Sequence, residues 1–81
     1  MNKFEIAFKE KRKNSIGFEF IYKVKSEEKF DAEVIVFDCG NPFVHQHVCS
    51  KGGDLLWHFR FWEDLCNSVI TYHELFKETK Q

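Results

Sequence analysis

Phe43-Val-His-Gln-His-Val-Cys49 and Leu55-Leu-Trp-His-Phe-Arg-Phe-Trp62 flank the tetrapeptide Lys51-Gly-Gly-Asp54, and this stretch decides the fold that the sequence predicts. Both flanking runs alternate between apolar and polar residues, which is typical of half-buried strands. A Gly-Gly pair between two such runs favours a tight turn, because the central positions of that turn need positive φ. The sequence therefore predicts a β-hairpin that turns at Gly52-Gly53.

The hydrophobic pattern also predicts the register of this hairpin. Val48 is expected opposite Trp57, and His47 opposite His58, with Gln46 as the one misfit on the apolar face. A slip by one residue would bury polar side chains of the second strand beside the valines, so it is disfavoured. Three of the four histidines and one cysteine then share the polar face.

This cluster is a candidate zinc site, since imidazole and thiolate are ligands that zinc prefers. Residues four apart on an extended strand lie about 13 Å apart, so His45 and Cys49 do not reach one ion together. Two ligand sets stay open: His45, His47 and His58, or His47, Cys49 and His58. The alternative to a metal site is a polar strip on a half-exposed sheet face, which needs no ligand.

Three more alternating segments precede the hairpin, each with large apolar residues at every second position. Polar turns or a Gly-Asn-Pro loop separate them. The expected strands cover residues 3–9, 16–25 and 30–39, with turns at 11–15 and 26–29 and the loop at 40–42.

A helix is expected after Trp62, because apolar residues from Leu65 to Phe76 follow helical spacing. Glu63 and Asp64 suit the start of a helix and Lys77 suits its end. A helix beginning at Leu55 is the alternative. It would carry an apolar arc over more than half of its circumference, which is too wide for an exposed helix in so small a domain.

The predicted fold class is therefore α+β, in two layers. A curved antiparallel meander of about five strands carries one C-terminal helix on its apolar face, and residues 1–81 form a single domain. The chain has 81 residues, ten of them phenylalanine, so a few aromatic rings supply much of the core.

Composition narrows the classes of function. The net charge of -1 gives no overall field that would attract nucleic acid or an acidic membrane. Three cysteines without paired spacing indicate no disulfide framework, and no signal peptide or membrane span is visible. The expected location is the cytoplasm, and no cofactor other than the candidate zinc is expected.

Three smaller features can each be interpreted as structural or as functional. Cys39, in the loop after a strand, is expected to be incidental rather than a nucleophile, because no base is shown beside it. The basic turn at residues 9–13 is expected to be solvated, with weak nucleic-acid binding as the alternative. His73 lies on the apolar stripe of the helix and is expected to be a core histidine with one nitrogen satisfied.

Apolar groups on the polar side of the sheet give the main functional prediction. The helix is expected to leave this outer face uncovered, and a contiguous exposed apolar surface usually marks a partner site. We therefore expect a small soluble non-enzymatic protein-binding module, of the inhibitor, immunity or adaptor kind, or a homodimer. The expected contact residues are Ile35, Phe37, Phe43, Leu56 and Trp62.

Overall fold

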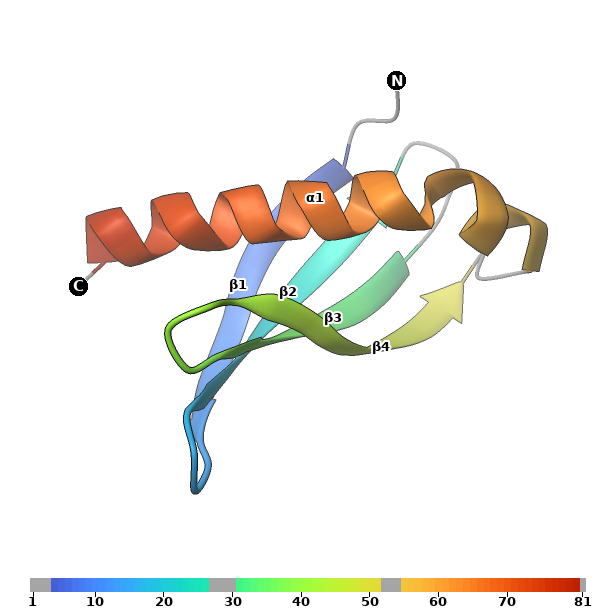
Figure 1. Ribbon diagram of the computed structural model, residues 1–81. Helices are drawn as coiled ribbons and strands as arrows, with labels where there is room; N and C mark the ends of the chain where they lie inside the picture. Colours follow the sequence, from blue (N-terminus) through green and yellow to red (C-terminus); the bar gives the residue numbers. More distant parts are fainter. Residues whose placement is uncertain (1–3, 27–30, 52–54, 81) are drawn as a thin grey trace.

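A four-stranded antiparallel sheet carries one long helix across one of its faces (Figure 1). The computed structural model describes residues 4–26, 31–51 and 55–80, without the side chains of 49–61, 79 and 80. Strand order follows the chain, so the sheet is a meander with β1 and β4 at its edges. The elements are β1 (Phe4–Lys13), β2 (Phe18–Ser26), β3 (Asp31–Asp38), β4 (Phe43–Lys51) and α1 (Leu55–Lys80).

Alternation along the strands separates an inner face, toward α1, from an outer face. The core is formed by buried residues of the inner face of β2 and β3 together with Leu65 and Val69 of the helix. The predicted two-layer α+β fold is confirmed, with four strands rather than five. Among the described residues, no helix has the length and apolarity needed to cross a membrane.

The predicted second strand of the hairpin is wrong, because residues 55–62 are the first two turns of α1. Their alternation coincides with a helical stripe: Trp62 precedes Leu65 by three residues and Val69 by seven. Trp62 packs against the core from the helix. The predicted pairs Val48 with Trp57 and His47 with His58 are therefore not formed. The turn at 52–54 lies outside the described residues.

A β-bulge in β4 reverses the alternation that the sequence predicted there. Val44 pairs with Val36, but Gln46 pairs with Ile35, so His45 is an extra residue between them. Beyond the bulge, His47 faces inward opposite Val34, while Val48 faces outward and is 56% exposed. Val44 and Val48 thus do not share a face, and Gln46 is no longer a misfit, because it lies on the outer side.

The basic segment 9–13 was expected to be a turn, and this prediction is also wrong. β1 continues through it to Lys13 after a bulge at Lys9. The turn comes later, where Asn14 Oδ1 accepts hydrogen bonds from the backbone N–H groups of Ile16 and Gly17, each at 3.1 Å. An asparagine that bonds two residues onward is a common way to close such a turn.

Candidate functional site

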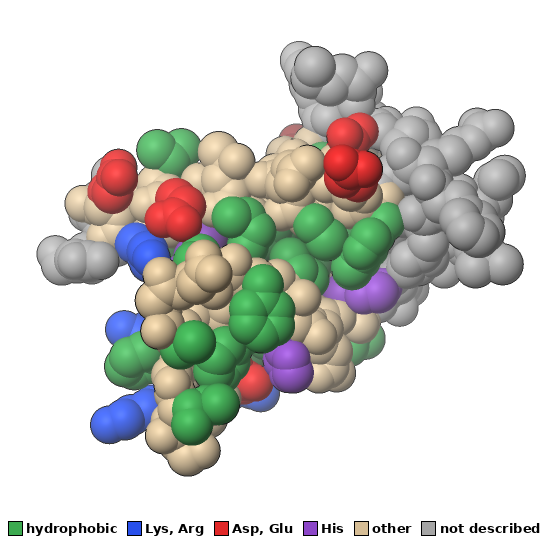
Figure 2. All heavy atoms as spheres, in the orientation of Figure 1, with side chains coloured by type: hydrophobic (Ala, Val, Ile, Leu, Met, Phe, Trp, Pro, Cys, Tyr) green, Lys and Arg blue, Asp and Glu red, His purple; other side chains and the backbone are tan. Residues whose placement is uncertain are grey.

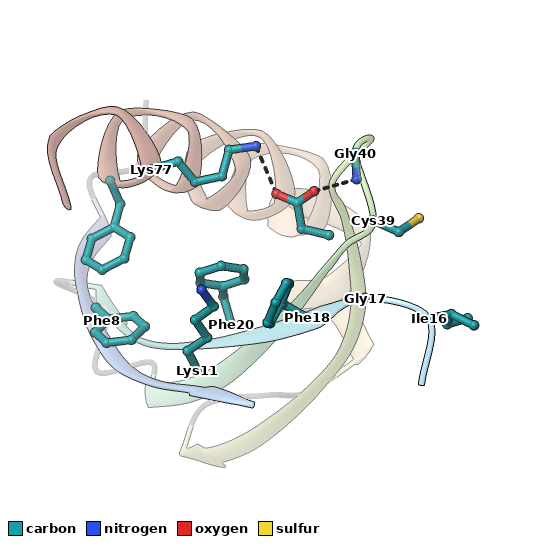
Figure 3. Close-up of a pocket in the computed structure, with 11 residues that line it drawn as sticks. Phe8, Lys11, Ile16, Gly17, Phe18, Phe20, Cys39, Gly40 and Lys77 are labelled. Atoms are coloured by element: carbon teal, nitrogen blue, oxygen red, sulfur yellow. Dashed lines mark hydrogen bonds and ion pairs between the residues drawn. The ribbon is translucent and has the colours of Figure 1, made fainter. Parts of the chain in front are cut away.

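A pocket of about 630 Å³ lies between the C-terminal half of α1 and the sheet. It lies where the β1–β2 turn and the β3–β4 loop approach the helix (Figure 3). Its volume is within the range of sites that hold small organic ligands. Its lining comprises Phe8, Lys11, Ile16, Gly17, Phe18, Phe20, Asp38, Cys39, Gly40, Phe76 and Lys77.

Aromatic rings form most of the apolar wall. Phe8 stacks on Phe76 with ring centroids 4.5 Å apart, which joins β1 to the helix. Phe18 and Phe20 lie next to each other on the inner face of β2, with their centroids 6.5 Å apart. Phe20 is buried, whereas Phe8 and Phe18 are each 37% exposed. The rings of Phe8 and Phe18 therefore lie at the opening of the pocket.

Two glycines allow the β3–β4 loop to close one side of the pocket. At Gly17, an added Cβ would lie 2.9 Å from the carbonyl oxygen of Asp38 and 3.1 Å from Cβ of Cys39. Only glycine therefore lets the β1–β2 turn lie this close to the loop. Gly40 has φ of +119°, a conformation that favours glycine, and its N–H donates to Asp38 Oδ1 at 2.9 Å.

A chain of hydrogen bonds runs from the pocket wall into the core. Lys77 Nζ donates to Asp38 Oδ2 at 2.9 Å, and His73 Nε2 lies 2.7 Å from the same oxygen. The other ring nitrogen of His73, Nδ1, lies 2.5 Å from the hydroxyl oxygen of Tyr22. Tyr22 and His73 are fully buried, and Asp38 is 8% exposed. These contacts connect β2, β3 and the helix at one point.

One neutral tautomer of His73 is compatible with the donors and acceptors of this chain. An ionised Asp38 accepts from His73 Nε2–H, which leaves Nδ1 free to accept from the hydroxyl of Tyr22. Burial by itself would raise the pKa of Asp38, but hydrogen bonds from His73, Lys77 and Gly40 outweigh it and lower the pKa to about 2. Burial raises the pKa of Tyr22, and the bond to Asp38 raises that of Lys77. The neutral tautomer of His73 satisfies both ring nitrogens.

The same chain resembles a catalytic arrangement in its residue types only. A nucleophile or general base must come within hydrogen-bond distance of its substrate. Tyr22 and His73 have no exposed surface and do not line the pocket. Lys77 and Asp38 do line it, and they are bonded to each other. In this structure the chain of hydrogen bonds joins the sheet to the helix and holds one side of the pocket.

The histidines predicted to bind zinc are not brought together. The bulge turns His45 outward, where Nε2 lies 3.8 Å from Glu19 Oε2, and turns His47 inward, where its ring centroid lies 4.4 Å from that of Trp62. His58 is in α1, and its side chain and that of Cys49 fall outside the described ones. No group of three potential ligands occurs among the described side chains. Zinc binding stays a prediction without the geometry that suggested it.

The five residues predicted for the outer face are divided between the two sides of the sheet. Phe43 is 51% exposed on the outer side, and it lies opposite Phe37, which is buried, with Ile35 farther along β3. Trp62 belongs to the helix on the inner side. Leu56 is also in α1, and its side chain is outside the described ones. Hydrophobic side chains still gather over the middle of the surface seen in Figure 2, below acidic groups along the helix.

Cys39 and the basic segment 9–13 were the two minor candidates from the sequence. Cys39 is an exposed free thiol at the pocket, and Figure 3 shows its sulfur pointing away from the cavity. In the basic segment, Lys9 bonds Glu33 at 2.7 Å and Arg12 bonds Glu10 at 3.1 Å, so two of its cations already have carboxylate partners.

Neither the pocket nor the role of Asp38 was predicted from the sequence. Two signals were present: a carboxylate at the end of an apolar strand, and a histidine on the apolar stripe of a helix. Their pairing across 35 residues had no local signature. No family model, curated protein or solved structure matches this chain, so its function has to be argued from this site.

Proposed function

We propose that the protein is a non-enzymatic binding module, and that the aromatic pocket holds the apolar part of a small ligand. The observation that carries this proposal is a cavity of about 630 Å³ walled by phenylalanines, two of them partly exposed at 37%. Protein interiors are normally close-packed, so an open apolar space of this size costs packing energy that a ligand could restore. A concave apolar site with a few polar groups is also typical of ligand binding.

One observation supports binding rather than catalysis, and a second supports a location in the reducing cytoplasm. The groups that resemble catalytic residues, Tyr22 and His73, are fully buried. Of the cysteines whose side chains are described, Cys39 and Cys66 are both free thiols. Free thiols are the usual state in the cytoplasm, which is the location that we propose.

The pocket is tested with a neutral fluorescent probe, N-phenyl-1-naphthylamine. We expect saturable binding of one probe per chain, with a dissociation constant on the order of 10 µM. Phe18→Ala removes part of the aromatic wall and should weaken binding about tenfold, since a ring contributes roughly 1–2 kcal/mol to such a contact. The measurement is a fluorescence titration.

Phe43→Ala is the matched control, because that ring is 51% exposed and lies outside the pocket. It should leave the dissociation constant unchanged. Equal losses in both variants, or no loss in Phe18→Ala, would contradict the assignment of binding to this pocket. Circular dichroism of both variants confirms that the fold is retained.

A second candidate function is contact with a protein partner, a second copy included, through the outer face of β4. The specific observation is the exposed Phe43 next to Phe37 and His45, with ring centroids 5.7 and 6.4 Å away. We expect light scattering to reveal concentration-dependent dimers that Phe43→Lys disrupts, because a charge on an apolar contact is costly to bury. A monomer at all concentrations, unchanged by the substitution, would count against self-association.

A further inference from the structure

The pocket is lined by more positively than negatively charged groups. Its lining contains two lysines, Lys11 and Lys77, and one aspartate, Asp38, so its net charge is +1. The remaining residues of the lining are apolar side chains, glycines and Cys39. An apolar cavity strengthens electrostatic contacts, because water screens them less there. The identity of the unpaired charge therefore bears on which ligand the pocket selects.

Hydrogen bonds within the protein occupy most of the acceptor capacity of Asp38. Its Oδ2 accepts from His73 and Lys77, and its Oδ1 accepts from the backbone N–H of Gly40. A carboxylate accepts about four hydrogen bonds, and a cationic ligand would have to compete with Lys77 for the charge of Asp38. The pocket is therefore poorly suited to an amine.

Lys77 is already matched by carboxylates. Its Nζ lies 2.9 Å from Asp38 and 3.7 Å from Glu74 on the next turn of the helix. The bond to Asp38 holds the ammonium on the wall beside the β3–β4 loop (Figure 3). It adds positive charge to that side of the cavity, but two neighbouring carboxylates offset most of it.

Lys11 has a different environment. Its Nζ lies 4.3 Å from the ring centroid of Phe18 and 5.3 Å from that of Phe20. Among the side chains that the structure describes, no carboxylate lies within ion-pair distance of it. Cation–π attraction holds the ammonium over the rings, and Figure 3 shows it pointing into the cavity. It is thus an exposed positive group beside an aromatic surface, without a counter-ion among the described side chains.

We propose that the pocket selects an aromatic monocarboxylate, whose ring packs among Phe8, Phe18 and Phe76 and whose carboxylate pairs with Lys11. This inference rests on the proposed function, because it assumes that the pocket binds a small ligand. The aromatic wall favours a planar ring, which makes stacked or edge contacts with phenylalanine. One unmatched ammonium favours one negative charge, and a second negative charge would be repelled by Asp38.

The test compares two compounds of the same shape, 2-naphthoate and the neutral 2-naphthamide. Each is titrated against the protein in competition with the neutral probe N-phenyl-1-naphthylamine. We expect 2-naphthoate to bind about tenfold more tightly, as a charge-assisted contact in a partly dry site should allow. This preference should shrink as salt is raised, because the ammonium lies near the opening.

Lys11→Met keeps most of the side-chain length and removes the charge, so the tenfold preference should fall to about one. Lys23→Met is the matched control, since Lys23 is an exposed lysine on the outer face of β2 and changes the net charge equally. It should retain the preference. Equal binding of both compounds to the unmodified protein would overturn the inference and leave the binding pocket itself supported. Failure of both to displace a probe that binds would also overturn it, and failure of the probe to bind would contradict the proposed function.

Discussion

Replacing Asp38 by Asn is expected to lower the free energy of unfolding by about 3 kcal/mol, because it places a donor against donors in a buried site. One oxygen of Asp38 faces the N–H of Gly40, and the other faces His73 and Lys77. An amide has only one oxygen, so its NH₂ group must oppose one of these partners. For a chain of this length, we expect the midpoint of thermal unfolding to fall by roughly 15 °C.

The matched control for this change is Asp64→Asn, at an exposed position of α1. It should alter the free energy of unfolding by less than about 0.5 kcal/mol. Thermal or urea unfolding followed by circular dichroism measures both variants. Equal stability of Asp38→Asn and the unmodified protein would mean that the carboxylate does not hold the loop and helix together.

Asp38→Asn should also change how the free energy of unfolding depends on pH. The pKa of Asp38 is lowered from its ordinary value of 3.8 to about 2 in the folded protein. Its ionised form therefore stabilises the fold above pH 4, and this contribution of about 2 kcal/mol is lost as the pH falls from 4 to 2. The difference in unfolding free energy between the two proteins should narrow by that amount over this range. Other carboxylates affect both proteins alike, so the difference isolates Asp38.

Leu65→Ala is expected to cost about 3 kcal/mol of stability, because Leu65 is fully buried between the helix and the sheet. The loss combines the transfer of apolar surface with the cavity that remains. Leu75→Ala is the matched control in the same helix, at a side chain that is 58% exposed. It should cost less than about 1 kcal/mol, and helix propensity cancels between the two variants because the substitution is identical. Denaturant unfolding measures both, and equal losses would mean that α1 does not pack as the structure describes.

Three strands of the sheet were predictable because their apolar residues alternate with polar ones. In β1, Ile6 and Phe8 lie opposite Val24 and Tyr22, as a shared half-buried face requires. The two central strands pair without any shift in register. Alternation with a period of two therefore contained enough information to predict β1, β2 and β3 and the two-layer class.

The predicted hairpin after β4 failed because two periods fitted the same residues. Trp57, Phe59 and Phe61 recur at every second position, as in a strand, whereas Leu55, Phe59 and Trp62 recur at helical spacing that continues into Leu65 and Val69. Tertiary packing decided between strand and helix, because the apolar inner face of the sheet is buried by packing against a helix. A helix from Leu55 was disfavoured because much of it would have been exposed on its own, whereas Trp62 packs against the core.

The candidate site could not be derived from the sequence for a different reason. Its groups come from four elements that are distant in the chain: Lys11 from β1, Phe18 from β2, Asp38 from β3 and Lys77 from α1. Only Gln46 gave a local warning, because a polar residue on a predicted apolar face indicated that the alternation changed phase there. A bulge next to this misfit is what places His45 and His47 on opposite faces of the sheet.

Across the described strands, the bulges of the sheet occur in the two outermost ones. The extra residues are Lys9 in β1 and His45 and Ser50 in β4. An edge strand offers unpaired N–H and C=O groups to any other extended chain, which is a common start of amyloid-like aggregation. A bulge interrupts the regular spacing of those groups and increases the local twist. In the described strands these bulges therefore shorten the regular ladder that another extended chain could continue at either edge, which would limit growth of the sheet into fibrils.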